Sequence, residues 1–245
     1  MIGLQSHPMR PRSICFLLVA LFAIQTIPAA EKKLYESGTK SRSGIGKYFK
    51  GREIAHFMSH MGAPWLERGE RDKEERPDLL MKALALKPGM HVADIGCGSG
   101  FYARKMAKEV GNTGLVYGVD IQKEMLVILR KNMQANNATN FVAVLSDVAD
   151  PKLPAGKIDL ALFVDVYHEF EFPHEMMLKI AKSLKKGGRV VLVEYRQEDP
   201  EVPIKYLHKM TQLQVAKEMS LQPDLEWQQT IHTLPWQHVI IYQKK

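Results

Sequence analysis

Short apolar runs alternate with amphipathic stretches over residues 91–194. Runs rich in Val, Ile and Leu are typical of strands that are buried on both faces of a parallel sheet. Stretches with apolar residues at every third or fourth position predict the helices that separate these strands. The pattern predicts strands near 91–95, 115–119, 140–145, 158–164 and 189–194, and helices at 101–110, 123–136 and 174–185.

The same reading extends to both sides of this core. Apolar spacing indicates a short amphipathic helix over residues 48–60, and Pro77 favours the start of a second helix over 78–86. A further helix is expected at 204–219, and two final strands at 227–233 and 238–243. Alternating strands and helices of this kind predict an α/β fold.

A glycine-rich turn joins the first predicted strand to the helix that follows, over residues 94–100. A side chain at Gly96, Gly98 or Gly100 would hold the backbone away from a ligand. The start of the helix presents unpaired N–H groups, which attract an anionic group. Strand, glycine turn and helix together are typical of the first unit of a nucleotide-binding fold.

Acidic residues end the second and third predicted strands. Asp120, which precedes Ile121, lies about twenty residues after the glycine turn, near the spacing at which an acid binds ribose hydroxyls. Asp147, which precedes Val148, can reach an adenine amino group. A nicotinamide-dependent enzyme would share the first acid, but it would usually carry a small residue in place of Phe101.

This set, D-x-G-x-G-x-G followed by two acids, resembles the class I S-adenosylmethionine-dependent methyltransferases. Residues 159–165 and 184–193 are similar to the fourth strand and to the helix–Gly-Gly–strand junction of that superfamily. The resemblance implies a Rossmann-like, doubly wound, mostly parallel seven-stranded sheet with an antiparallel last strand and added N-terminal helices. It implies S-adenosyl-L-methionine as cofactor, bound by Asp94, Gly96, Gly98, Gly100, Asp120, Ile121, Asp147, Val148 and Asp165.

The methyl acceptor is less constrained. Residues 51–58 and 62–68 resemble a group of bacterial proteins described only as methyltransferases of unassigned substrate, so we expect an unidentified small-molecule acceptor. A nicotinamide-dependent oxidoreductase and a cofactor-binding protein without catalysis are the alternatives. The net charge is +7, but no basic stripe with interleaved aromatic residues is visible, so a nucleic acid is not an expected partner.

Two residues are candidates for catalysis. His168 follows the fourth strand, and its ordinary pKa suits removal of a proton near neutrality, although it can also simply line the pocket. Glu194 ends the fifth strand and is expected to contact the acceptor or to pair with Arg196. His56 and His60 can share a helix face, but no third ligand is evident, so no metal site is expected.

The N-terminus has the order of a secretory signal peptide. Arg10 and Arg12 precede an apolar run over 14–24, and small residues follow at 29–30. Residues 1–30 are therefore interpreted as a signal peptide, which implies export to the periplasm or the medium. An uncleaved membrane anchor or a cytoplasmic protein is the alternative. The apolar run is too short for a stable membrane span in the mature chain.

The sequence divides the mature chain into two parts. Residues 31–47 are rich in Ser, Gly and Lys and are interpreted as a flexible linker. The methyltransferase domain is expected over 48–245, and its first part, 48–76, is interpreted as a lid or cap over the cofactor. The oligomeric state is left open.

Overall fold

Seven strands form the central sheet in a computed structural model that describes residues 1–3 and 33–245. Their order is β6-β5-β4-β7-β8-β10-β9. Neighbouring strands from β6 to β8 are parallel, whereas β10 is antiparallel to both β8 and β9. The predicted fold is therefore confirmed. The strands are β4 (His91–Ile95), β5 (Leu115–Asp120), β6 (Phe141–Leu145), β7 (Ile158–Val164), β8 (Leu184–Tyr195), β9 (Leu225–Ile231) and β10 (Gln237–Lys244).

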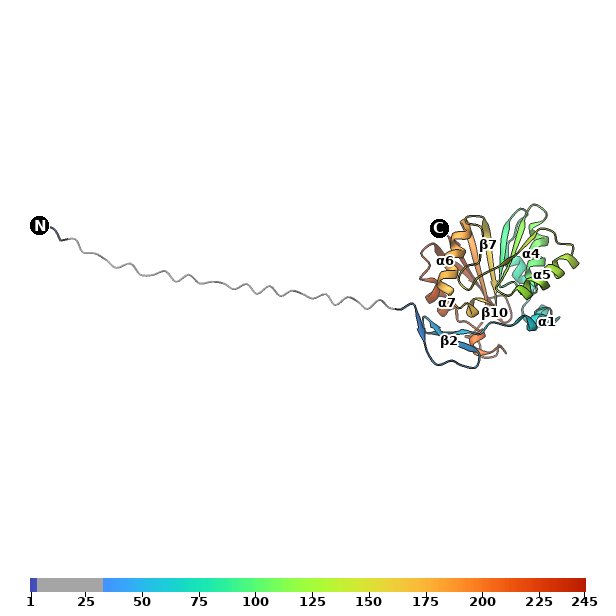
Figure 1. Cartoon of the computed structure of the whole chain (residues 1–245), viewed down its shortest axis with the longest axis horizontal. Helices are drawn as coiled ribbons and strands as arrows, with labels where there is room; N and C mark the ends of the chain where they lie inside the picture. The colour runs from blue at the N-terminus through green and yellow to red at the C-terminus, as the bar shows by residue number, and fades with distance from the viewer. Residues whose placement is uncertain (4–32) are drawn as a thin grey trace. The chain divides into compact units, whose positions relative to one another are not determined.

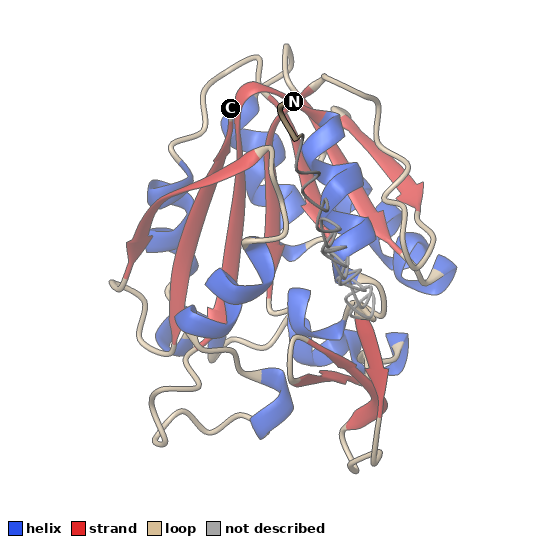
Figure 2. Cartoon of the chain, turned by 90° about the vertical axis from the view of Figure 1, so that its left-hand side faces the viewer, coloured by secondary structure: helices blue, strands red, loops and turns tan. Residues whose placement is uncertain are grey.

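Helices cover both faces of this sheet (Figures 1 and 2). One face packs against α3 (Pro77–Leu84), α4 (Phe101–Val110) and α5 (Lys123–Ala135), and the other packs against α6 (Pro173–Ser183) and α7 (Gln212–Met219). Successive strand residues point to opposite faces, so Val92 belongs to the first apolar core and Ala93 to the second. Burial on both faces explains the apolar runs of the central strands β4, β7 and β8.

The chain order reverses between β4 and β7. From β4 the chain continues outward through β5 and β6, and it then returns to place β7 on the other side of β4. The loops after β4 and β7 therefore diverge at the carboxyl edge of the sheet. In open α/β sheets this is the position of the ligand crevice. The loop after β7 carries a short helix, η2 (Tyr167–Glu169).

A second, three-stranded sheet precedes this domain and consists of β1 (Tyr35–Ser37), β2 (Gly44–Phe49) and β3 (Arg52–Ala55). The predicted helix over 48–60 is wrong, because β2 and β3 form a hairpin there. Phe49 pairs with Arg52 across Lys50 and Gly51, which both have positive φ angles. Such a two-residue turn matches the twist of a hairpin, and a residue pair that ends in glycine is its signal.

The prediction of a flexible linker over 31–47 is also wrong for the described part of that range. β1 pairs antiparallel with β2, and the loop between them is held by the carboxylate of Glu53. One oxygen of Glu53 accepts the backbone N–H groups of Ser41 and Gly46, each at 3.0 Å. A Ser- and Gly-rich composition thus encodes a tight turn here, because a buried acid from the next strand organises it.

The predicted helix over 204–219 is only partly correct. It is divided into η3 (Tyr206–His208) and α7, and extended backbone lies between them. Buried Met210 donates its N–H to the carbonyl of Tyr195, so this segment lies against the end of β8. The hydroxyl of Thr211 then accepts the N–H of Gln214 and starts α7. Tertiary pairing at Met210 overrides the helical pattern.

Export stays a prediction at this point. The proposed signal peptide, residues 1–30, lies outside the described residues except for positions 1–3. Within residues 33–245, no helix combines the length and the apolar character that a membrane crossing requires.

A buried ion pair fastens the small sheet to the main domain. Arg52 in β3 donates two hydrogen bonds to the carboxylate of Glu218 in α7, at 2.8 and 3.0 Å. Its third nitrogen donates to the carbonyl of His168 in η2 at 2.9 Å. Both partners of the ion pair are almost fully buried. The position of the small sheet is thereby coupled to the loop after β7.

We expect Arg52→Met to destabilise the protein by about 3 kcal/mol, because it leaves a buried carboxylate without its cation. This loss of stability is at the lower end of the range for breaking a buried ion pair, because the side chain of Gln214 still donates a hydrogen bond to Glu218. Chemical denaturation measures the change. Arg76→Met is the matched control, because Arg76 pairs with Asp78 in an exposed position and should produce no measurable change. Equal stability of both variants would contradict the assignment.

Candidate functional site

A cavity of about 710 Å³ lies at the carboxyl edge of the central sheet, within the usual range for ligand pockets. Its wall combines the ends of the central strands with residues 56–76, which we name the cap segment. This segment includes η1 (His60–Gly62), α1 (Ala63–Leu66) and α2 (Arg71–Glu74). Of the residues predicted from the sequence, the cavity is lined by Gly96, Gly98, Asp120, Ile121, Asp147, Val148, Asp165 and His168.

The glycine turn after β4 lies in close contact with its surroundings. Gly96 and Gly98 have φ angles of +66° and +51°, which side chains rarely tolerate. An added Cβ at Gly96 would lie 2.4 Å from the side chain of Val166, and one at Gly98 would lie 2.5 Å from Leu66. The sequence analysis explained these glycines only by the close approach of a ligand. The structure adds that Gly98 also makes room for the cap segment.

Asp120 lies at the end of β5, beneath the glycine turn. Its two carboxylate oxygens accept the N–H groups of Gly98 at 3.0 Å and Gln122 at 2.9 Å. Burial raises the pKa of Asp120, while these backbone N–H groups act in the opposite direction. A carboxylate offers about four acceptor sites, so capacity remains for hydroxyl groups of a ligand.

The residues after β5 and β6 form one end of the cavity. Ile121 and Val148 line it and are 42% and 41% exposed, so their apolar surface is available to a ligand. Asp147 lies beside them and pairs with Lys152 at 3.0 Å. An apolar wall with an acid at its margin is suited to a flat heteroaromatic group.

Two buried acids lie near the start of the glycine turn. Oδ1 of Asp165 and Oδ2 of Asp94 are buried and have no hydrogen-bond partner among the described residues. Burial raises the pKa of Asp94 to about 7 and raises that of Asp165 well above its ordinary value. Asp165 lines the cavity, whereas Asp94 and Gly100 do not. Direct contact of Asp94 and Gly100 with a cofactor therefore stays a prediction.

The cap segment is tied to the segments that follow β4 and β5 by polar contacts that the sequence did not reveal. Glu67 accepts the hydroxyl of Ser99 in the glycine turn and two hydrogen bonds from Arg104 in α4. The side-chain amide of Gln122 accepts the N–H of His60 and donates to the carbonyl of Met58, at 2.8 and 2.9 Å. These contacts span 32 residues or more of chain, so no local pattern announces them.

The two predicted catalytic residues meet directly. Nδ1 of His168 lies 2.6 Å from Oε2 of Glu194, and the other oxygen of Glu194 accepts the N–H of Tyr167 at 3.0 Å. Burial disfavours the charged imidazole, but the adjacent carboxylate of Glu194 outweighs this effect and raises the pKa of His168. The sequence-based alternative of a Glu194–Arg196 ion pair is wrong, because Arg196 instead donates to backbone carbonyls.

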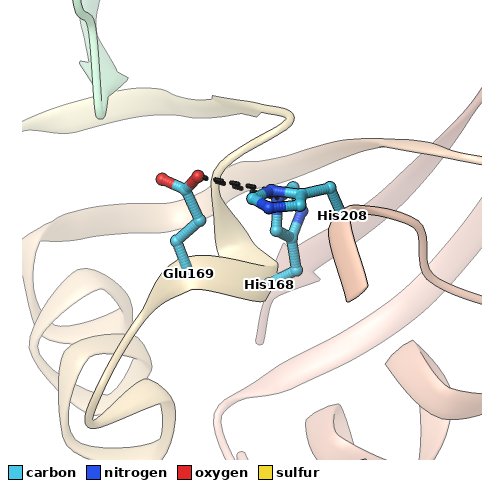
Figure 3. Close-up of side chains that lie close together, drawn as sticks. All are labelled: His168, Glu169 and His208. Atoms are coloured by element: carbon cyan, nitrogen blue, oxygen red, sulfur yellow. Dashed lines mark hydrogen bonds and ion pairs between the residues drawn. The ribbon is translucent and has the colours of Figure 1, made fainter. Parts of the chain in front are cut away.

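Two further residues complete this cluster (Figure 3). Nε2 of His168 lies 3.2 Å from Nδ1 of His208, which comes from η3. Oε1 of Glu169 lies 3.6 Å from that nitrogen of His208 and 3.9 Å from Nε2 of His168. All three residues line the cavity. His56 and His60, which the sequence analysis considered for a metal, are not part of such a group among the described residues.

Comparison with known proteins assigns the family. Residues 86–239 match a family of methyltransferase domains, so the chain belongs to that family. The match includes the whole glycine turn, the strand-end acids and the cluster around His168. S-adenosylmethionine is therefore the cofactor of this class of protein, as the sequence predicted.

Individual relatives add limited detail. The chain is 30% identical over 201 residues to an uncharacterized 37.1 kDa protein in transposon TN4556 of Streptomyces fradiae, covering 77% of this chain and 57% of that protein. It is 29% identical to a probable cobalt-precorrin-6B C(15)-methyltransferase of Saccharolobus solfataricus, covering 49% and 60%. The chain thus spans less than two thirds of either relative.

A solved structure shares the fold. A SAM dependent methyltransferase from Aquifex aeolicus superposes with a TM-score of 0.72 at 19% identity, over 77% of this chain and all of that protein. The superposition supports the shared architecture. At this low sequence identity it does not indicate the methyl acceptor.

The buried acid Asp94 makes a prediction about stability. Its pKa of about 7 exceeds that of an unfolded aspartate, near 4, so the folded state holds the proton more tightly. Without ligand, the contribution of Asp94 to the free energy of unfolding should therefore fall as pH rises from about 4 to about 7. Asp94→Asn should lack this decline in denaturation measurements across that range. Parallel pH profiles for both proteins would contradict the assignment.

Proposed function

We propose that the protein transfers a methyl group from S-adenosylmethionine to a small-molecule acceptor. One observation carries this proposal most directly. The glycine turn and Asp120 meet in one cavity at the point where strand order reverses, with both oxygens of Asp120 organising the loops around it.

The cavity residues fit the parts of this cofactor. Asp120 has acceptor capacity for the ribose hydroxyls, and Asp147 lies beside apolar Ile121 and Val148 for the adenine. The free Oδ1 of Asp165 suits the ammonium group of the methionine moiety. Arg71 also lines the cavity and suits the carboxylate, since only its Nε and Nη1 are used by Glu75 and the carbonyl of Leu66.

Methyl transfer requires no covalent bond between the protein and the reacting groups. The sulfonium of the cofactor supplies the electrophile, and the protein aligns the acceptor with the methyl group. His168, supported by Glu194, lies in the same cavity and is the candidate to receive a proton from the acceptor. The aromatic residues Phe57, Trp65 and Phe170 contribute apolar wall, which supports an acceptor of small-molecule size.

Asp120→Ala should weaken binding of S-adenosylhomocysteine by roughly ten- to a hundred-fold, because a hydrogen-bonded carboxylate contributes about 1.5–3 kcal/mol. Titration calorimetry measures the affinity, and Asp120→Asn tests the charge with less change in volume. Asp224→Ala, which removes an exposed acid far along the chain, is the control and should bind as the unmodified protein does. Unchanged affinity in both Asp120 variants would overturn the cofactor assignment.

The same titration separates the alternatives. A nicotinamide-dependent enzyme should bind NAD in preference to S-adenosylhomocysteine. A cofactor-binding protein without catalysis should bind S-adenosylhomocysteine but transfer no radiolabelled methyl group to any member of an acceptor library. The family match favours methyl transfer over both.

We also propose that the protein is exported. Support comes from the order of basic, apolar and small residues over positions 10–30. We expect the mature protein to begin at or near Ala30 or Glu31 and to fractionate outside the cytoplasm. Mass spectrometry of the terminus from the source cell measures this. An intact Met1 or Met9 terminus on cytosolic protein would contradict export and leave the enzymatic proposal untouched.

A further inference from the structure

We propose that His168, Glu169 and His208 form a binding site for a single divalent transition-metal ion of the zinc class. The ligand atoms are Nε2 of His168, Nδ1 of His208 and Oε1 of Glu169. The site lies in the wall of the cavity and leaves at least one coordination position facing it. The existence of the site is independent of the proposed function, whereas its use on an acceptor rests on that function.

The spacing of the three atoms carries this inference. They lie 3.2, 3.6 and 3.9 Å apart. Two ligands of a tetrahedral zinc ion are separated by about 3.4 Å, because each lies 2.0–2.2 Å from the metal. A point equidistant from the three atoms lies about 2.1 Å from each, within that range. The ligands can therefore reach one ion with little movement.

The orientation of His168 is already that of a metal ligand. Its Nδ1 faces the buried carboxylate of Glu194, so Nε2 faces Glu169 and His208. A carboxylate that binds the far nitrogen of a ligating histidine fixes its tautomer and orientation and makes it a better donor. Glu194 is thus a positioning residue, and its second hydrogen bond, from Tyr167, holds it in place.

The backbone behind the ligands is also fixed. His168 and Glu169 share η2, whose carbonyl at His168 accepts from Arg52, and Arg52 is itself paired with Glu218. Oε1 of Glu169 accepts the N–H of Met58 at 3.2 Å, which orients the carboxylate. Figure 3 shows Glu169 and His208 directed toward each other above His168. Preorganised ligands lose little conformational freedom on binding.

The donor set selects the class of cation. Two imidazoles and one carboxylate suit zinc, iron, cobalt or nickel, whereas magnesium and calcium prefer oxygen ligands throughout. Three protein ligands with an open position are typical of sites that act on a bound molecule. If the proposed function holds, metal-bound His168 would not act as the base, because its Nε2 is then a ligand and its Nδ1 faces Glu194. An acceptor oxygen or sulfur ligating the ion would instead lose its proton to solvent. It would then attack the cofactor's methyl carbon as the bond from that carbon to sulfur breaks, which leaves S-adenosylhomocysteine.

This inference departs from the sequence analysis, which expected no metal site. The His168–His208 distance is also that of a hydrogen bond between two imidazoles. In that alternative arrangement, the two histidines form a hydrogen bond that does not involve Glu169, and the cluster binds no cation. Metal titration distinguishes the two arrangements directly.

The test uses the full chain, purified without a polyhistidine tag and stripped with a chelator. We expect one equivalent of Co²⁺ to bind and to produce visible absorption bands typical of low coordination number. Mass spectrometry after equilibrium dialysis should show one equivalent of Zn²⁺. His208→Ala and Glu169→Gln should weaken binding by at least about a hundred-fold, and Glu194→Gln by about ten- to a hundred-fold. His232→Ala, which removes an exposed histidine, should bind as the unmodified chain does.

Each outcome is decisive. The metal site would be overturned if the unmodified chain bound neither Co²⁺ nor Zn²⁺ stoichiometrically. It would also be overturned if the His208 and Glu169 variants bound these ions as tightly as the unmodified chain does. Circular dichroism of all variants shows that they are folded. Titration with S-adenosylhomocysteine measures cofactor binding by the same proteins. It also separates the two proposals, because binding of S-adenosylhomocysteine without metal sustains the proposed function alone, and the reverse result sustains the metal site alone.

Discussion

The candidate site depends on the glycine turn after β4, because only a backbone without side chains lets neighbouring segments pack directly against it. At Gly96 and Gly98 the absence of a side chain lets the loop after β7 and the cap segment contact the turn, through Val166 and Leu66. On the opposite side, Leu129 of α5 approaches Gly100 in the same way. Three elements from distant parts of the chain therefore converge on one turn. Leu66 and Val166 also line the cavity, so two of these contacts form part of its wall.

Buried charge organises the rest of the cavity wall. Burying a charge is unfavourable unless a partner compensates it, so such groups fix the geometry of their surroundings. Glu194 holds the loop after β7 through Tyr167 and His168, and Arg52 joins that loop to both the small sheet and Glu218. Asp94 and Asp165 are exceptions, because one oxygen of each has no partner among the described residues. A group that folding leaves uncompensated is one that a ligand can satisfy.

The central sheet could be predicted because its signal is local. The parallel strands β4 to β8 each contain a short apolar run, and the turn between β4 and α4 carries its glycines at fixed spacing. The N-terminal region failed for the opposite reason. Residues 36–47 have the composition of a linker, yet Glu53 organises them into a turn between paired strands. Likewise, Met210 is not helical, although the pattern over 204–219 predicts a helix, because its backbone pairs with Tyr195. In both places a distant partner outweighs local preference.

The sequence by itself determined the α/β class, the order of the strands along the chain, the glycine turn and the acids that follow β5 and β6. These features depend on periodicity and on short spacings, which the chain displays without folding. Only the tertiary structure brought Glu194 to His168 across 26 residues and His208 to His168 across 40. It also revealed the ties from Glu67 and Gln122 that close the cap segment over the cavity. Such long-range contacts depend on how the loops that follow different strands are arranged at the edge of the sheet. No local sequence pattern specifies that arrangement.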